Sequence, residues 1–201
     1  MKRLSLPVIG AALALFAAAA LWGAASASRE RLPVLPKDPE SARLLTELEA
    51  QWPAAEDVEK SSLRVPSKTL SLGVSNPLYR CWQLSLTGER ALQILGLLER
   101  LKALQDSVRT AKKDLLKEAS LYAAQPGAEA LSRVRARSNS LKGLLAAYKA
   151  LLESGRRMEL LKVSEPSSFT EHLSVSGALR EEDYVMSYDD ALPECPPRGS
   201  R

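Results

Sequence analysis

The chain has 201 residues, with 28 Lys and Arg, 24 Asp and Glu, and a single histidine. Few residues are aromatic and many are Leu or Ala, which favours long helices and argues against a β-sandwich. About 170 residues follow the apolar N-terminal segment, which is enough for one modest domain.

The first 28 residues, MKRLSLPVIGAALALFAAAALWGAASAS, begin with two basic residues and continue into a long uncharged run. This pattern is typical of an export signal or a membrane anchor, so we expect the rest of the chain to lie outside the cytoplasm. Ala25-Ser26-Ala27 fits the small-x-small cleavage rule, whereas the run from Leu4 to Trp22 approaches the length of a spanning helix. Two alternatives stay open. The chain is either an inner-membrane protein with one span over residues 4–25, facing the periplasm, or a periplasmic protein cleaved near Ala27.

Residues 29–68 are predicted to form a spacer that contains one short helix. Residues 29–37 carry two prolines and indicate an extended segment. Asp38 can cap the helix and Pro39 suits its first turn, while Trp52-Pro53 is predicted to end it after Gln51. The polar residues 54–68 are then predicted to be loop.

Residues 69–180 are predicted to form an α+β domain. Thr69–Ser75 and Tyr79–Thr87 alternate polar and apolar residues on either side of an Asn-Pro turn, which predicts an antiparallel pair of strands. Met158–Val163 and His172–Ala178 predict a second pair in the same way. We expect the four strands to join into one small antiparallel sheet.

Between the strand pairs, residues 89–155 are predicted to form a long antiparallel helical hairpin that turns at Gln125-Pro126-Gly127. Ser154-Gly155 is predicted to end its second helix. Apolar residues recur at a three–four spacing and define a seam along each helix. The predicted seam consists of Ile94, Leu97, Leu101, Leu104, Val108, Ala111, Leu115 and Tyr122 in the first helix, and of Leu131, Val134, Ser138, Leu141, Leu145, Tyr148 and Leu152 in the second.

Two interpretations of the seam stay open. Each helix can bury its seam against the other, or part of the apolar surface can bind a partner. Five leucines beside the seam widen it, which favours a third helix taken from the short N-terminal helix or from a second subunit. We predict helix-against-helix contacts with a partner through Ile94, Leu98, Leu101, Leu104, Val108, Leu141, Leu145 and Leu152.

Charge is unevenly distributed along the chain. Residues 89–157 hold fourteen Lys and Arg against seven Asp and Glu, whereas residues 29–63 and 164–201 are both net acidic. A basic middle with acidic flanks can neutralise itself within one molecule or between subunits. Nucleic-acid binding is not expected, because the chain is predicted to be exported and the basic region lacks interleaved aromatics.

The two cysteines, Cys81 and Cys195, leave two alternatives open. Outside the cytoplasm they can form a disulfide, or each can stay a free thiol. Residues 181–201 are acidic and then rich in proline, and they are predicted to be a loosely ordered tail.

The sequence contains no recognisable catalytic, cofactor-binding or metal-binding motif. His172 is predicted to lie in a strand without Cys, Asp or Glu at ligand spacing, so we expect a surface or packing role for it. No Gly-rich phosphate loop, nucleophile elbow or Cys-x-x-Cys occurs. We therefore predict no catalytic residues, no cofactor and no metal site, and we do not expect an enzyme.

Two stretches carry a resemblance to a known family. QLSLTGERALQILGLLERL (Gln83–Leu101) combines an apolar strand, a glycine and a helix. MELLKVSEP (Met158–Pro166), followed by EHLSVSGALREEDY (Glu171–Tyr184), combines a strand, a turn and a strand that runs into charged residues. Their order, behind one apolar N-terminal segment, resembles the periplasmic ferredoxin-like domain of inner-membrane assembly proteins of type IV pili and type II secretion. The resemblance implies a non-enzymatic scaffold that dimerises and couples an inner-membrane platform to other periplasmic parts.

These observations together favour a scaffold that mediates protein–protein assembly through its helical hairpin, as a homo- or hetero-oligomer with other membrane or periplasmic proteins. The alternative is a soluble periplasmic holdase whose basic helical arms clasp acidic or unfolded clients. Cleavage after Ala27 would favour the holdase, and retention in the membrane would favour the scaffold.

Overall fold

The computed structural model describes residues 32–167, 171–189 and 194–195. The chain consists of two compact units, Met1–Pro33 and Val34–Arg201. The unit from Val34 onward is described below. The predicted signal or anchor over residues 1–28 lies outside the described residues, as does most of the Pro-rich end of the predicted tail. Within the described ranges, no helix is both long and apolar enough to cross a membrane.

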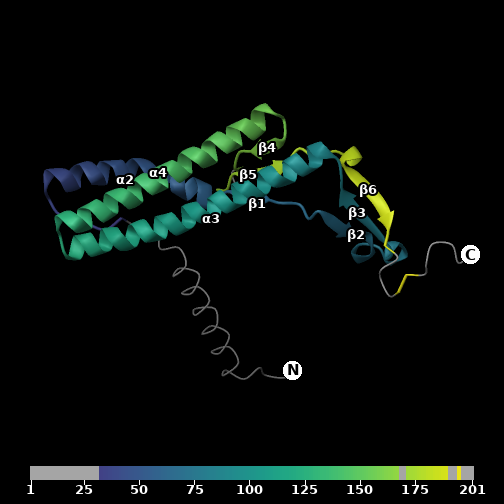
Figure 1. The fold of residues 1–201 in the computed structure, drawn as a ribbon, viewed down its shortest axis with the longest axis horizontal. Coiled ribbons are helices and arrows are strands. Elements are labelled where there is room, and N and C mark those ends of the chain that lie inside the picture. Colours follow the sequence, from purple (N-terminus) through teal and green to yellow (C-terminus); the bar gives the residue numbers. More distant parts are fainter. Residues whose placement is uncertain (1–31, 168–170, 190–193, 196–201) are drawn as a thin grey trace, which may run out of the picture. The chain divides into compact units, whose positions relative to one another are not determined.

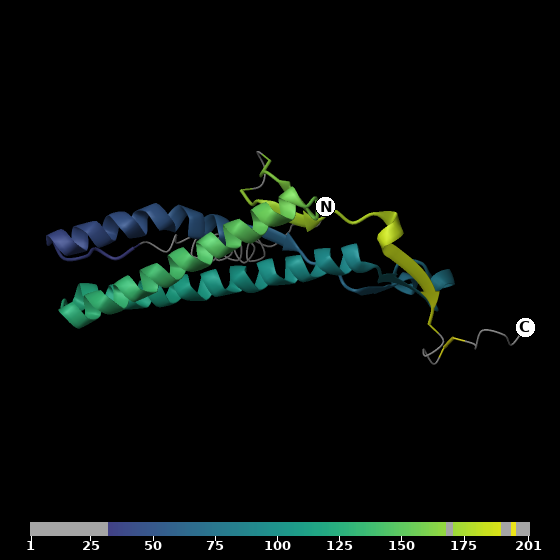
Figure 2. The same cartoon turned by 45° about the horizontal axis from the view of Figure 1, so that its top comes forward.

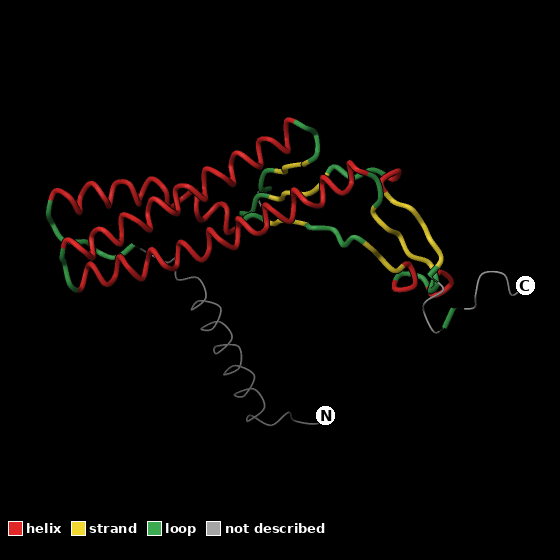
Figure 3. Tube along the Cα trace, viewed as in Figure 1, coloured by secondary structure: helices red, strands yellow, loops and turns green. Residues whose placement is uncertain are grey.

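The described part of the chain is α+β, as predicted (Figures 1 and 3). Its long helices are α2 (Pro39–Lys60), α3 (Glu89–Ala124) and α4 (Ala128–Arg157). Its strands are β1 (Ser62–Arg64), β2 (Thr69–Ser71), β3 (Trp82–Leu86), β4 (Leu161–Ser164), β5 (Ser174–Gly177) and β6 (Tyr184–Tyr188). Three short 3-10 helices connect them, namely η1 (Leu72–Val74), η2 (Pro77–Tyr79) and η3 (Glu181–Asp183).

Helices α3 and α4 form the predicted hairpin, and α2 lies along both of them (Figures 1 and 2). The prediction of a third helix is therefore confirmed, and the N-terminal helix of the same chain provides it. A helix pair leaves apolar surface uncovered on one side, and packing a third helix there removes that surface from water.

The interior stripe of α3 is a regular heptad pattern, but its phase differs from the predicted seam. The buried residues are Ala91, Ile94, Leu98, Leu101, Gln105, Val108, Lys112, Leu115, Ala119 and Tyr122. The prediction that Leu97, Leu104 and Ala111 belong to the interior is wrong, because these residues are only half-buried. The buried positions are one residue further along, at Leu98, Gln105 and Lys112. Because Gln105 and Lys112 are polar, a search for apolar residues does not find this interior stripe.

Helix α4 buries most of its predicted seam, including Leu131, Val134, Leu141 and Tyr148. The prediction that it ends at Ser154-Gly155 is wrong, since the helix continues to Arg157. Gly155 is buried inside the helix, where a Cβ would lie 2.5 Å from Leu161 Cδ1 and 2.6 Å from Leu97 Cδ2. This glycine permits a close approach of α4 to its neighbours rather than a helix end.

Helix α2 begins as predicted and ends later than predicted. Asp38 Oδ1 accepts hydrogen bonds from the backbone N–H groups of Glu40 (3.0 Å) and Ser41 (2.9 Å), which caps the helix. The predicted end at Trp52-Pro53 is wrong, because the helix continues through Pro53 to Lys60. A proline inside a helix costs about 3 kcal/mol. Tertiary burial on both sides of it, at Leu48 and Val58, offsets this cost.

The strands form two separate three-stranded sheets, so the prediction of one four-stranded sheet is wrong. The predicted pairs themselves are confirmed, because β2 pairs with β3 and β4 pairs with β5, both antiparallel. Each sheet gains a strand from a segment that was predicted to be loop or tail. Strand β1 pairs in parallel with β5, and β6 pairs antiparallel with β3.

The C-terminal segment is fixed to the β2–β3–β6 sheet. Cys81 and Cys195 form a disulfide whose Cα atoms are 5.6 Å apart, which decides between the two alternatives for the cysteines. The backbone N–H of Asp189 also donates to the carbonyl of Cys81 at 2.7 Å. The predicted loose tail is therefore wrong for Tyr184–Tyr188, which is a strand of this sheet.

Among the residues that the structure describes, three ion pairs connect the basic middle of the chain to its acidic flanks. They join Arg135 to Glu40 (3.4 Å), Lys112 to Glu59 (2.6 Å) and Arg90 to Asp183 (3.0 Å). Neutralisation within one molecule, one of the two predicted possibilities, is confirmed at these positions.

Candidate interaction surface

The eight residues predicted to bind a partner fall into two groups. Ile94, Leu98, Leu101, Val108 and Leu141 have no exposed surface and form the interior of the three-helix bundle. Leu104, Leu145 and Leu152 are half-buried. The structure brings Leu145 and Leu152 together in an open groove and leaves Leu104 outside it.

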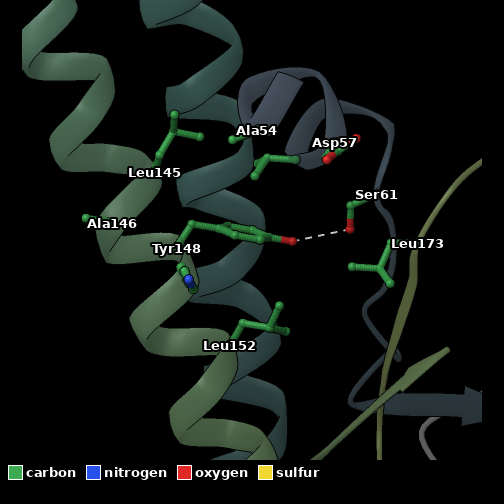
Figure 4. A pocket seen from close by; sticks show the side chains of 10 residues that line it. Ala54, Asp57, Ser61, Leu145, Ala146, Tyr148, Leu152 and Leu173 are labelled. Carbon is green, nitrogen blue, oxygen red and sulfur yellow. Dashed lines mark hydrogen bonds between the residues drawn. The ribbon is translucent and has the colours of Figure 1, made fainter. Parts of the chain in front are cut away.

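The groove has a volume of about 350 Å³ and lies between α2 and α4, with Leu173 from the segment before β5 closing one side (Figure 4). Residues at spacing i, i+3, i+4 and i+7 line the groove on both sides. Ala54, Asp57 and Val58 lie in α2 and Ser61 is its C-cap, while α4 contributes Leu145, Tyr148, Lys149 and Leu152, together with Ala146. Such a set occupies one face of a helix, so two helical faces border a common furrow.

The polar groups of the groove are few and are placed on its floor and rims. The hydroxyl groups of Tyr148 and Ser61 are 3.2 Å apart and bridge α4 and the end of α2 across the floor (Figure 4). Burial raises the pKa of the Tyr148 phenol, and its hydrogen bond with Ser61 opposes part of that increase. Tyr148 therefore stays neutral at pH 7. The charged residues of the groove are Asp57 on α2 and Lys149 on α4, and both are exposed.

A buried amide holds the end of α2 beside this groove. Gln105 is 2% exposed, and its Nε2 donates to the carbonyl oxygens of Val58 (2.8 Å) and Ser61 (2.7 Å). The carbonyls at the end of a helix have no partner within the helix, so this side chain from α3 supplies a donor to the Ser61 carbonyl and a second donor to the Val58 carbonyl, which also accepts from the N–H of Ser61 at 3.3 Å.

A buried ion pair lies one heptad further along α3. Lys112 Nζ is 2.6 Å from Glu59 Oε2 and 4.8 Å from the centre of the Trp52 ring, so α2 supplies both a carboxylate and an aromatic face. Together with Gln105, this contact fixes how α2 lies on the hairpin and therefore how wide the groove is.

The α2 side of the groove was missed by the sequence analysis, because residues 54–68 were predicted to be loop. A signal was present: Leu44, Leu48, Ala55 and Val58 continue one apolar face across Pro53 at helical spacing. Proline usually ends a helix, and Pro53 therefore obscures this pattern.

The prediction that His172 lies in a strand is wrong, because His172 is exposed and lies just before β5, which begins at Ser174. In the part of the chain that the structure describes, no group of three or more His, Cys, Asp or Glu side chains is arranged to hold a metal ion.

Comparisons with known proteins give no match: no family model, no curated protein and no solved structure is significantly similar to the chain.

Proposed function

We propose that this chain is a non-enzymatic scaffold that binds an apolar helix of a partner protein in the groove between α2 and α4. The observation that carries the proposal is the pair of i, i+3, i+4, i+7 faces that border the groove. A furrow between two helices accepts the ridge of another helix, because side chains of one interdigitate with those of the other. Leu145 and Leu152, both predicted to contact a partner, line this furrow.

The length of the groove matches about two turns of a partner helix, and its charges indicate which residues that helix carries. Ala54 to Ser61 span about 10 Å at 1.5 Å per residue. Ala54 and Ala146 are small, so the backbone of an incoming helix can approach closely. Asp57 and Lys149 offer one charge of each sign at the rims. The expected partner segment is thus an apolar helical stripe flanked by a basic and an acidic residue.

We further propose that the scaffold works at the periplasmic face of the inner membrane. The basic start and apolar run of residues 1–28 support export, and the disulfide between Cys81 and Cys195 supports an oxidising compartment. A role in a pilus or secretion apparatus rests on the sequence resemblance alone. Fractionation with sequencing of the mature N-terminus distinguishes a retained anchor from cleavage near Ala27.

The groove is tested by placing a photo-crosslinking amino acid at Ala146 or at Ala147 in the full chain in its native cells. Both residues are exposed on α4, but only Ala146 lines the groove. We expect a discrete adduct from position 146 whose partner peptide is an apolar helical segment. Leu145→Asp with Leu152→Asp should remove the adduct, whereas Leu121→Asp, at an exposed apolar position outside the groove, should leave it.

The proposal fails if positions 146 and 147 give the same products, or if the adduct persists in the Leu145→Asp, Leu152→Asp variant. The loss of an adduct counts only where the variant keeps the urea midpoint of the parent chain, because half-buried leucines also contribute to stability.

A further inference from the structure

Strand β6 forms one edge of the β2–β3–β6 sheet (Figure 1). Among the residues that the structure describes, no further strand pairs with its outer side. An edge of this kind presents a row of backbone N–H and C=O groups to which another extended chain can bind. Natural sheets usually prevent such binding by a short edge strand, or by a charged residue or a proline on the edge.

The three other edge strands of the described chain have this protection, and β6 does not. Strands β1 and β2 have three residues each, and β1 also contains Arg64. Strand β4 contains the exposed Lys162. Strand β6 has five residues, YVMSY, none of which is charged or proline. It is therefore the edge that is most open to an added strand.

The register with β3 determines which backbone groups of β6 point outward. The N–H of Thr87 donates to the carbonyl of Asp183 at 3.0 Å, one residue before β6 begins. In an antiparallel ladder, residues that bond the neighbouring strand alternate with residues whose N–H and C=O point away from it. The odd-numbered residues of β6 therefore bond β3, and Met186 at the centre of the strand directs its N–H and C=O to the open side.

An added strand would also extend an apolar row across the sheet. Leu70 of β2, Leu84 of β3 and Met186 of β6 lie directly opposite one another. Met186 is 53% exposed at the open end of this row, and Val185 on the other face of β6 is 49% exposed. Apolar side chains opposite each other on paired strands stabilise a sheet. We therefore expect apolar residues in the segment that pairs with β6.

The charge around β6 is acidic. Residues 181–194 contain six Asp and Glu and no Lys or Arg. Arg90 and Arg180 form ion pairs with two of these carboxylates, and Arg80 lies just before β3. Six carboxylates thus stand against three guanidinium groups, and a segment with Lys or Arg on either side of its apolar residues complements this edge.

The same charges disfavour a second copy of the chain as the occupant. Two β6 strands paired antiparallel would bring residues 181–183 of one copy beside residues 189–190 of the other. Two strands paired in parallel would bring each acidic flank beside its own copy. Both arrangements place like charges together, which opposes association.

We propose that the open edge of β6 binds an extended segment of a partner protein, whose apolar residues are flanked by Lys or Arg. The segment adds a fourth strand to the sheet, so that main-chain hydrogen bonds provide affinity and the side chains provide specificity. This surface is made by other elements than the groove between α2 and α4, and the inference does not depend on the function proposed for that groove.

The test places a photo-crosslinking amino acid at Val185, or at Leu70 as the matched control, in the full chain in its native cells. Leu70 is apolar and 42% exposed, and it lies on β2 at the opposite edge of the same sheet. Met186→Pro removes the outward N–H of β6 but no bond to β3, since an edge strand accepts proline at such a position. Met186→Thr keeps that N–H and controls for the loss of the methionine side chain.

We expect an adduct from position 185 and not from position 70, with a crosslinked peptide that carries apolar residues between basic ones. Met186→Pro should reduce the adduct by about tenfold or more, and Met186→Thr by less than about threefold. An equal reduction in the two variants overturns main-chain pairing. No adduct at position 185, or the same products at both positions, overturns the open edge as a binding site, and an adduct with a second copy overturns the choice of partner.

A charge variant tests the proposal without changing the strand itself, and it decides the case if Met186→Pro lowers the urea midpoint. Glu181 and Glu182 are both exposed. Glu181→Lys with Glu182→Lys should therefore keep the midpoint of the parent chain and reduce the adduct by about threefold or more. An undiminished adduct in this variant overturns the basic partner segment.

Discussion

Replacing Gln105 by leucine tests whether a single buried amide holds α2 in place. The substitution removes both donors to the carbonyls of Val58 and Ser61 and leaves an apolar side chain of similar size. Each hydrogen bond contributes about 1 kcal/mol net, and a buried carbonyl left without a donor costs about 1–3 kcal/mol. Val58 keeps a 3.3 Å contact from the N–H of Ser61, so the larger loss falls on the Ser61 carbonyl. We expect Gln105→Leu to lower the free energy of unfolding by about 2–3 kcal/mol.

The assay is urea unfolding of the full chain followed by far-ultraviolet circular dichroism, with the slope of the transition compared between variants. Gln93→Leu is the control, because Gln93 lies on the exposed face of α3 and bonds only Glu89, at 3.2 Å, through its side chain. The control should change stability by less than about 0.5 kcal/mol. Equal midpoints for Gln105→Leu and Gln93→Leu would refute the reasoning, since the buried amide would then contribute no more than a surface residue does.

Three further predictions follow from named contacts. Gly143→Ala should stabilise α4 by about 0.5–1 kcal/mol, because a Cβ there meets nothing within 4 Å. Gly155→Ala should destabilise α4 by about 1–3 kcal/mol, because a Cβ there meets two leucines. Thermal unfolding of both variants checks that the two changes have opposite signs. Cys195→Ala should cost about 2–4 kcal/mol, since the disulfide joins residues 114 apart in sequence, and a reducing agent should lower the thermal midpoint of the parent chain but not of this variant. Hydrogen bonds from Ser41 lower the pKa of Asp38, so the carboxylate stabilises the fold above its ordinary pKa of 3.8 and loses this effect as the pH falls below it. The difference in unfolding free energy between the parent chain and Asp38→Ala should therefore shrink on acidification. A constant difference from pH 6 to pH 2 would contradict this account.

The hairpin was predictable because its turn and its periodicity are both explicit in the sequence. Pro126 and Gly127 mark the turn, and the three–four spacing on each side continues without interruption. The phase of the α3 stripe was not predictable from apolar residues alone. Gln105 and Lys112 occupy interior positions, and their role depends on carbonyls and a carboxylate of α2, which no local pattern of α3 can reveal.

Some of the strand pairings were predictable from local sequence and others were not. The two pairs joined by a short connection, β2 with β3 and β4 with β5, were predictable from alternation, since alternation indicates a half-buried face. The pairings that span the hairpin, β1 with β5 and β3 with β6, were not. Strand β1 has only three residues and pairs in parallel with a strand more than a hundred residues away, so its local sequence carries little signal. In β6, the alternating Tyr184, Met186 and Tyr188 were present, but acidic neighbours on both sides favoured a tail.

The groove itself was only half predictable, and the reason lies in the lengths of the helices. Helix α2 has 22 residues, while α3 has 36 and α4 has 30, so α2 cannot cover the whole hairpin. Its end is fixed at Lys60 by Gln105, so the turns of α4 that follow Tyr148 pack on α3, where Gly155 lies against Leu97, but have no neighbour from α2. Leu152 is half-buried for this reason, although its position in the heptad pattern is that of an interior residue. A leucine at an interior heptad position that no helix covers indicates a surface on which another helix can pack. The periodicity of α4 and the short length of α2 both predict this surface on the side of α4 that carries Leu152.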